Sequence, residues 1–175
     1  MRLKLLAALV LLAIMVGCGG PKADVSIFMM PSNGMSPAIA DQLQKNLQQQ
    51  LGATPTVRLS TTPIFSLDKM IVEVAAGDHG IIVLTKDQWL GIARTGGMVP
   101  LDDLLKPTDF PEGIVELPVD DLKGKTEQHL YAIPISNTKW MKSIGYKGEE
   151  LFAFLHPRAP DLEKSKQVLV NLSQK

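Results

Sequence analysis

The sequence of 175 residues is poor in cysteine, in aromatic residues and in net charge. A single cysteine excludes a disulfide scaffold. With 18 basic and 18 acidic side chains, the chain lacks the basic excess that nucleic-acid binding requires. Because 45% of the residues are apolar, an intrinsically disordered chain is also excluded. The length predicts one folded domain with an ordinary hydrophobic core.

A short apolar segment lies near the N-terminus, where Arg2 and Lys4 precede the wholly apolar residues 5–16. This run is too short for a hydrocarbon core that needs about 20 residues. The order of a basic start, an apolar run and small residues is typical of a secretory signal, so residues 1–17 are predicted to be removed.

The end of this segment, Met15-Val16-Gly17-Cys18, resembles a bacterial lipoprotein signal. Gly17 matches the small residue of that family, whereas Met15 stands where Leu, Val or Ile is usual. The resemblance implies that the Cys18 thiol carries diacylglycerol, with acyl chains such as palmitate, and starts the mature chain. The alternatives are a stray thiol in an ordinary signal, or a signal anchor that is never cut.

Lipidation would anchor the chain at the extracytoplasmic face of the cell membrane, because two acyl chains hold a protein stably. Residues 18–23 are then the lipidated cysteine and a short tether, and residues 24–175 a single α/β domain. If Cys18 is processed in this way, its sulfur is in thioether linkage and is neither a nucleophile nor a metal ligand, which excludes cysteine catalysis.

The domain is predicted to begin with a strand at 25–30 and a turn at Gly34. Ser36 is expected to cap a helix that ends at Gly52. Its apolar face comprises Met35, Ile39, Leu43, Leu47 and Leu51. A second strand at 56–62 precedes a second helix, capped by Ser66 and closed by Gly77, whose apolar residues are Leu67, Met70, Ile71 and Val74.

The continuous apolar run at 80–85 predicts a central strand, and Thr85 with Gln88 forms a capping box for a helix over 86–94. Later elements are expected to be a surface excursion at 106–129, an edge segment at 131–135, a strand at 151–155 and a helix at 161–172. The predicted fold class is α/β, with a mostly parallel sheet flanked by helices.

Residues 80–105, GIIVLTKDQWLGIARTGGMVPLDDLL, resemble a segment of the extracellular solute-binding proteins of ABC importers. Residues 131–135 and 151–172 resemble later segments of the same family. The resemblance implies a periplasmic-binding-protein type II fold, of which this chain is long enough for one lobe. A single lobe encloses little of a small ligand, whereas good pockets bury roughly 70–90% of its surface.

In an open parallel sheet, ligands bind beyond the carboxyl ends of the strands. The candidate ligand-binding residues there are Ser32, Asn33, Asp87, Trp89, Ser136 and Asn137. Each has an ordinary alternative: Asn33 as a turn residue, Asp87 at a helix start and Trp89 in the core.

The sequence contains no recognised catalytic motif, and no metal site or cofactor is predicted. His79, His129 and His156 are isolated and are expected to be solvated loop residues. The favoured function is a noncatalytic, lipid-anchored binding lipoprotein, with a small solute, an envelope protein or a permease as partner. The alternatives are a structural or accessory envelope lipoprotein and an unrecognised enzyme.

Overall fold

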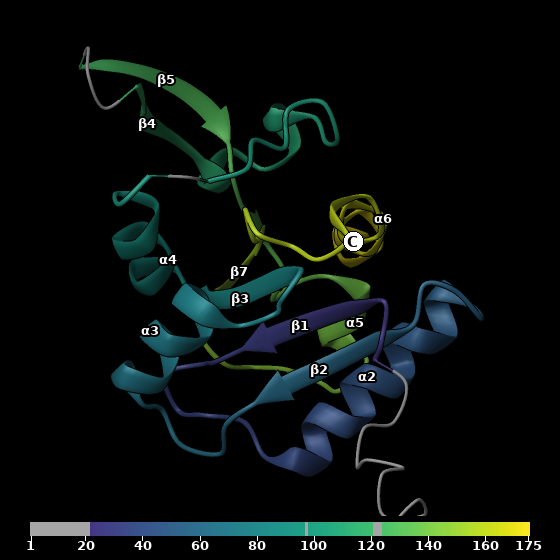
Figure 1. The fold of residues 1–175 in the computed structure, drawn as a ribbon. Helices are drawn as coiled ribbons and strands as arrows, with labels where there is room; N and C mark the ends of the chain where they lie inside the picture. The colour runs from purple at the N-terminus through teal and green to yellow at the C-terminus, as the bar shows by residue number, and fades with distance from the viewer. Residues whose placement is uncertain (1–21, 97, 121–123) are drawn as a thin grey trace, which may run out of the picture.

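A computed structural model of the chain describes residues 22–96, 98–120 and 124–175 (Figure 1). The predicted signal at 1–17 and the predicted lipidation site Cys18 lie outside the described residues. Within the described ranges, no helix has the length and apolar character needed to cross a membrane.

The structure is built on a five-stranded sheet with the strand order β2-β1-β3-β7-β6. The strands are β1 (Val25–Met29), β2 (Val57–Thr61), β3 (Ile81–Thr85), β6 (Ile133–Pro134) and β7 (Leu151–Leu155). β1 is parallel to β2 and β3, whereas β7 is antiparallel to both β3 and β6. The α/β class is confirmed, but the prediction of a mostly parallel sheet is wrong, because the sheet is mixed.

The direction of β7 follows from where the chain enters it. The chain leaves β6 at the edge where β1 and β3 end, since the Ile135 amide donates to the Leu151 carbonyl at 2.8 Å. The short helix α5 (Lys139–Lys142) lies in the connection, and β7 begins with Leu151 opposite Thr85. A strand that re-enters at the edge just left must run antiparallel. The apolar run at 151–155 carries no signal of direction.

Three main helices begin at the predicted caps: α2 spans Pro37–Leu51, α3 Leu67–Ala76 and α4 Lys86–Ala93. The last helix, α6, spans Leu162–Leu172 and is capped by Asp161. The Ser36 and Ser66 side chains accept hydrogen bonds from the first turns of α2 and α3. Thr85 and Gln88 form the reciprocal capping box of α4. These caps are local hydrogen bonds, which is why the sequence pattern locates them.

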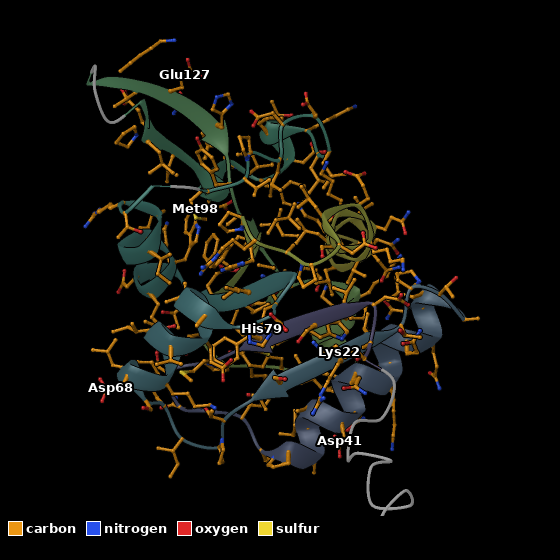
Figure 2. The ribbon with its side chains drawn as sticks, in the orientation of Figure 1. Lys22, Asp41, Asp68, His79, Met98 and Glu127 are labelled. Atoms are coloured by element: carbon orange, nitrogen blue, oxygen red, sulfur yellow. The ribbon has the colours of Figure 1, made fainter. Side chains whose placement is uncertain are left out.

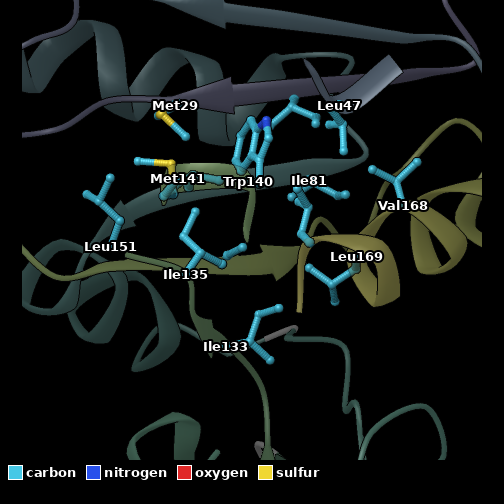
Figure 3. Close-up of a cluster of buried hydrophobic side chains, with 14 of the residues drawn as sticks. Met29, Leu47, Ile81, Ile133, Ile135, Trp140, Met141, Leu151, Val168 and Leu169 are labelled. Atoms are coloured by element: carbon cyan, nitrogen blue, oxygen red, sulfur yellow. The ribbon is translucent and has the colours of Figure 1, made fainter. Parts of the chain in front are cut away.

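Two layers of helices cover the sheet, with α3 and α4 on one face and α2, α5 and α6 on the other (Figure 1). Side chains fill the space between the layers (Figure 2). On the α2 side, Trp140 lies among Met29, Leu47 and Leu169 and donates its Nε1–H to the Leu43 carbonyl at 2.9 Å (Figure 3). This bond joins α5 to α2.

The stretch predicted as a surface excursion instead folds largely into a hairpin. After the 3₁₀ turns η1 (Pro107–Asp109) and η2 (Pro111–Gly113), β4 (Ile114–Asp120) pairs antiparallel with β5 (Lys125–Leu130). The hairpin extends past the β6 end of the sheet (Figure 1). Its charged residues masked the strand pattern in the sequence, although Leu117 and Leu130 are buried.

The predicted apolar faces of two helices are only partly buried. Met35, Leu43 and Leu47 are buried at α2, but Ile39 is 42% exposed. In α3 the buried residue is Met70, whereas Leu67 and Ile71 are more than half exposed. Helical periodicity places residues on a face, but only packing decides how much of that face is covered.

Candidate functional site

The loops that carry the predicted ligand-binding residues meet at one edge of the sheet. β1, β3 and β6 point the same way, because β3 and β6 are both antiparallel to β7 and β1 is parallel to β3. We call this the carboxyl edge, formed by loops 30–36, 62–66, 135–138 and 147–150 and by the first turn of α4. The structure therefore brings together residues that lie more than 100 positions apart in the chain.

Glu149 ties two of these loops together. The Ser32 amide donates to the Glu149 Oε1 atom at 2.5 Å, and the Ser136 hydroxyl donates to the Glu149 carbonyl at 3.1 Å. The Ser136 hydroxyl also accepts from the Leu151 amide at 2.9 Å. Ser136 thus fixes the loop before β7. Glu149 is not among the candidate residues predicted from the sequence, because only the adjacent Glu150 distinguishes it there.

The two asparagines of the carboxyl edge are exposed. Asn33 lies in a turn closed by a hydrogen bond from the Gly34 amide to the Pro31 carbonyl at 2.9 Å, and Gly34 has a φ of +70° that favours glycine. Asn137 lines an open hollow of about 350 Å³ together with Glu150 and the C-terminal Lys175. Both amides are accessible to a ligand or partner.

The two candidates from α4 differ in environment. Asp87 is exposed in the first turn, where its charge complements the helix dipole. Trp89 is fully buried and stacks on Phe152, with ring centroids 5.2 Å apart and planes inclined by 5°. Trp89 therefore supports the edge from the core.

Three buried polar atoms near this edge have no hydrogen-bond partner among the described residues: Thr61 Oγ1, Thr62 Oγ1 and Trp89 Nε1. Thr61 is the last residue of β2, Thr62 follows it, and Trp89 lies in the first turn of α4. An unsatisfied buried polar group costs about 1–3 kcal/mol, so such groups call for an explanation. Within the described residues, no contact satisfies these three groups.

Apolar side chains border the same edge. Ile64 is 76% exposed and follows β2, while Leu67 and Ile39 lie in the first turns of α3 and α2. Loops 30–36 and 62–66 are in contact, since the Met35 amide donates to the Thr62 carbonyl at 2.8 Å. An apolar border beside polar groups is a common feature of binding surfaces.

The expectation that the histidines are solvated is wrong for two of them. His79 and His156 are buried, with 6% and 2% exposure. His156 donates from Nε2 to the Val74 carbonyl at 2.8 Å, and its burial lowers its pKa. His129 lies between Glu127 and Asp102, and the hydrogen bond to Glu127 raises its pKa. Within the part of the chain that the structure describes, no group of three or more His, Cys, Asp or Glu side chains could hold a metal ion.

Comparison with known proteins adds no family: no protein-family model, curated protein or solved structure matches this chain.

Proposed function

We propose that this protein is a lipid-anchored, extracytoplasmic binding lipoprotein, similar to one lobe of a solute-binding protein of type II fold, and that it binds through its carboxyl edge. Cys18 is the proposed attachment point for the lipid. The resemblance of residues 15–18 to a lipoprotein signal supports the anchor, and the topology of the sheet supports the position of the binding surface.

The strand order of the sheet is the main support for the carboxyl edge as the binding surface. From β1 the chain passes through α2, on one face of the sheet, to β2, which is one neighbour of β1. It then passes through α3, on the other face, to β3, which is the other neighbour of β1. The strand order therefore reverses between β1 and β3, and ligands of open α/β sheets bind at such a switch point. The loop with Ser32 and Asn33 and the helix start with Asp87 stand on either side of it.

The shape of the edge favours a weakly held solute or a protein partner over a deeply enclosed ligand. The segment 106–130, where a second lobe would have to be inserted, contains a hairpin and two short 3₁₀ turns. One lobe leaves most of a small ligand in contact with solvent.

The exposed Ile39, Ile64 and Leu67 specifically favour the second candidate function, an accessory envelope lipoprotein whose partner is a protein. Cross-linking in intact cells, followed by identification of the linked peptides, tests this function. Cross-links from loops 30–36 and 62–66 to one envelope protein or permease are expected; cross-links confined to the outer faces of α2 and α6 would contradict it.

Thermal unfolding with added sugars, amino acids, peptides or metal ions tests the solute function, because a ligand that binds the native state raises its melting temperature. A compound that stabilises the wild type is expected to lose its effect in Asn33→Ala and Asp87→Ala. Gln42→Ala, on the exposed face of α2, should keep the effect. A shift that persists in both edge variants would contradict binding at the carboxyl edge.

A further inference from the structure

A second polar cluster lies at the opposite edge of the sheet, where β1 and β2 begin. Ser26 is the second residue of β1, between Val25 and Ile27, which pack on the α2 side. Because side chains alternate along a strand, Ser26 points to the α3 side. Its Oγ lies 2.9 Å from His79 Nδ1, and His79 Nε2 lies 2.7 Å from Glu73 Oε2. Three residues from separate elements thus form one chain of hydrogen bonds.

The imidazole of His79 is held in a fixed position beside β1 (Figure 2). Its ring stacks on Phe28 with centroids 5.3 Å apart. Glu73 also accepts a hydrogen bond from the Lys69 ammonium at 3.0 Å. Burial acts to raise the pKa of Glu73, but the hydrogen bonds from His79 and Lys69 outweigh it and lower the pKa. Glu73 is therefore a carboxylate at neutral pH.

This arrangement determines what each ring nitrogen can do. A carboxylate only accepts hydrogen bonds, so the proton of the neutral imidazole lies on Nε2 and is donated to Glu73. The lone pair of Nδ1 then faces the Ser26 hydroxyl, which donates to it. A hydroxyl next to an oriented neutral imidazole, itself held by a carboxylate, is the arrangement that activates a serine nucleophile.

Ser26 also lines an open pocket of about 270 Å³, together with Asp24, Arg58 and Asp78. Arg58 is the register partner of Ser26 on the neighbouring strand β2, and among the described residues no ion pair involves its guanidinium. The two aspartates are engaged, Asp24 by Lys164 at 2.6 Å and Asp78 by Lys22 at 3.3 Å. Arg58 thus leaves a positive charge beside Ser26 that suits an anionic group.

We propose that Ser26, His79 and Glu73 are a nucleophile, a base and a positioning carboxylate that hydrolyse small carboxylic esters bearing an anionic group. Ser26 Oγ attacks the ester carbonyl carbon while His79 Nδ1 takes the hydroxyl proton. The C–O bond to the alcohol breaks, and the alcohol leaves with that proton. Water, deprotonated by His79, then cleaves the acyl–Ser26 ester, releases the carboxylic acid and restores the hydroxyl.

The sequence conceals this cluster, because the three residues lack the spacing of a nucleophile elbow and are brought together by the α3–β3 connection. A triad is recognised by its geometry and not by the order of its residues. The proposal goes beyond the binding function and concerns the other end of the strands, so each site can be changed without altering the other.

Labelling of the full chain with a fluorophosphonate tests the nucleophile, since such a probe phosphonylates an activated serine and releases fluoride. Mass spectrometry is expected to locate the label on Ser26, and His79→Gln should abolish it. Ser60→Ala is the matched control, because Ser60 lies on β2 opposite Phe28, two register positions from Arg58. An unlabelled Ser26 in the folded wild type overturns the proposal, whatever the variants do.

Hydrolysis of p-nitrophenyl succinate, an anionic ester, tests the other roles. Ser26→Ala should lower kcat by about 100-fold or more. Glu73→Gln should lower kcat with little change in KM, whereas Arg58→Gln should mainly raise KM for this anionic ester. Equal rates for the wild type and Ser26→Ala would overturn the proposal. That failure would leave the carboxyl edge untouched, because binding there is measured separately by thermal shift.

Discussion

At the level of single residues, the groups that a side chain contacts determine its role more than its residue type does. Three histidines looked alike in the sequence, yet His79 is buried between Ser26 and Glu73, and His129 is half exposed between two carboxylates. Cys18 is the opposite case, because its proposed role depends on the residues next to it in the sequence and not on the fold.

Replacement of Cys18 by serine tests the anchor. In a bacterial host, the wild type is expected to incorporate labelled palmitate and to be recovered with membranes, whereas Cys18→Ser should remain an unlabelled precursor, because the hydroxyl does not replace the thiol in the attachment of diacylglycerol. Gly19→Ala, which changes the next residue, should be labelled like the wild type. Equal labelling of Cys18→Ser would refute the proposed lipidation.

At the scale of elements, hydrogen bonds between neighbouring segments decide how helices sit on the sheet. The two tryptophans are both fully buried, but they differ in this respect. Trp140 donates from α5 to the carbonyl of Leu43 in α2, while Trp89 Nε1 has no partner among the described residues. Comparing variants at the two positions therefore separates the contribution of the hydrogen bond to stability from that of ring burial.

Trp140→Phe is expected to lower the free energy of unfolding more than Trp89→Phe does. Each change removes part of a buried ring, but only Trp140→Phe also removes a hydrogen bond, which contributes about 0.5–1.5 kcal/mol. Urea denaturation of both variants measures the difference. An equal or larger loss in Trp89→Phe would show that Trp89 Nε1 has a partner in the native protein or that its ring packing is the more critical.

At the scale of the whole molecule, Asp24 joins parts that are distant in the chain. Its carboxylate accepts from the Thr56 amide, ahead of β2, at 2.8 Å and from the Lys164 ammonium of α6 at 2.6 Å. The hydrogen bond from Lys164 is the main reason that the pKa of Asp24 lies well below its usual value. The link holds the start of β1 to the neighbouring strand and to the last helix.

This link predicts a pH dependence of stability. A carboxyl group with a lowered native pKa stabilises the fold above its unfolded pKa, and that stability is lost as the pH falls toward the native pKa. Chemical denaturation is therefore expected to show a decline in stability below about pH 5 that is smaller in Asp24→Asn. The control is Asp41→Asn, which changes an exposed carboxylate of α2. An unchanged decline in Asp24→Asn would contradict the role of this link.

Residues close together in the sequence specify the local structure. The caps at Ser36, Ser66 and Thr85 and the strand at 151–155 lie where the pattern predicts them, because a cap or an apolar run is set by residues within a few positions of one another. The residues that follow β1, β3 and β6 lie at one edge of the sheet, because these three strands point the same way.

Long-range packing sets the direction of β7, the hairpin at 114–130, the exposure of Ile39 and Leu67, and the contact of Ser26 and Glu73 with His79. Each depends on which distant segments pack together, and a side chain's burial and hydrogen-bond partners come from that packing. Local periodicity carries no information about such partners, because the same pattern is compatible with several arrangements of the elements. The candidate binding edge was therefore visible in the sequence, whereas the proposed catalytic cluster was not.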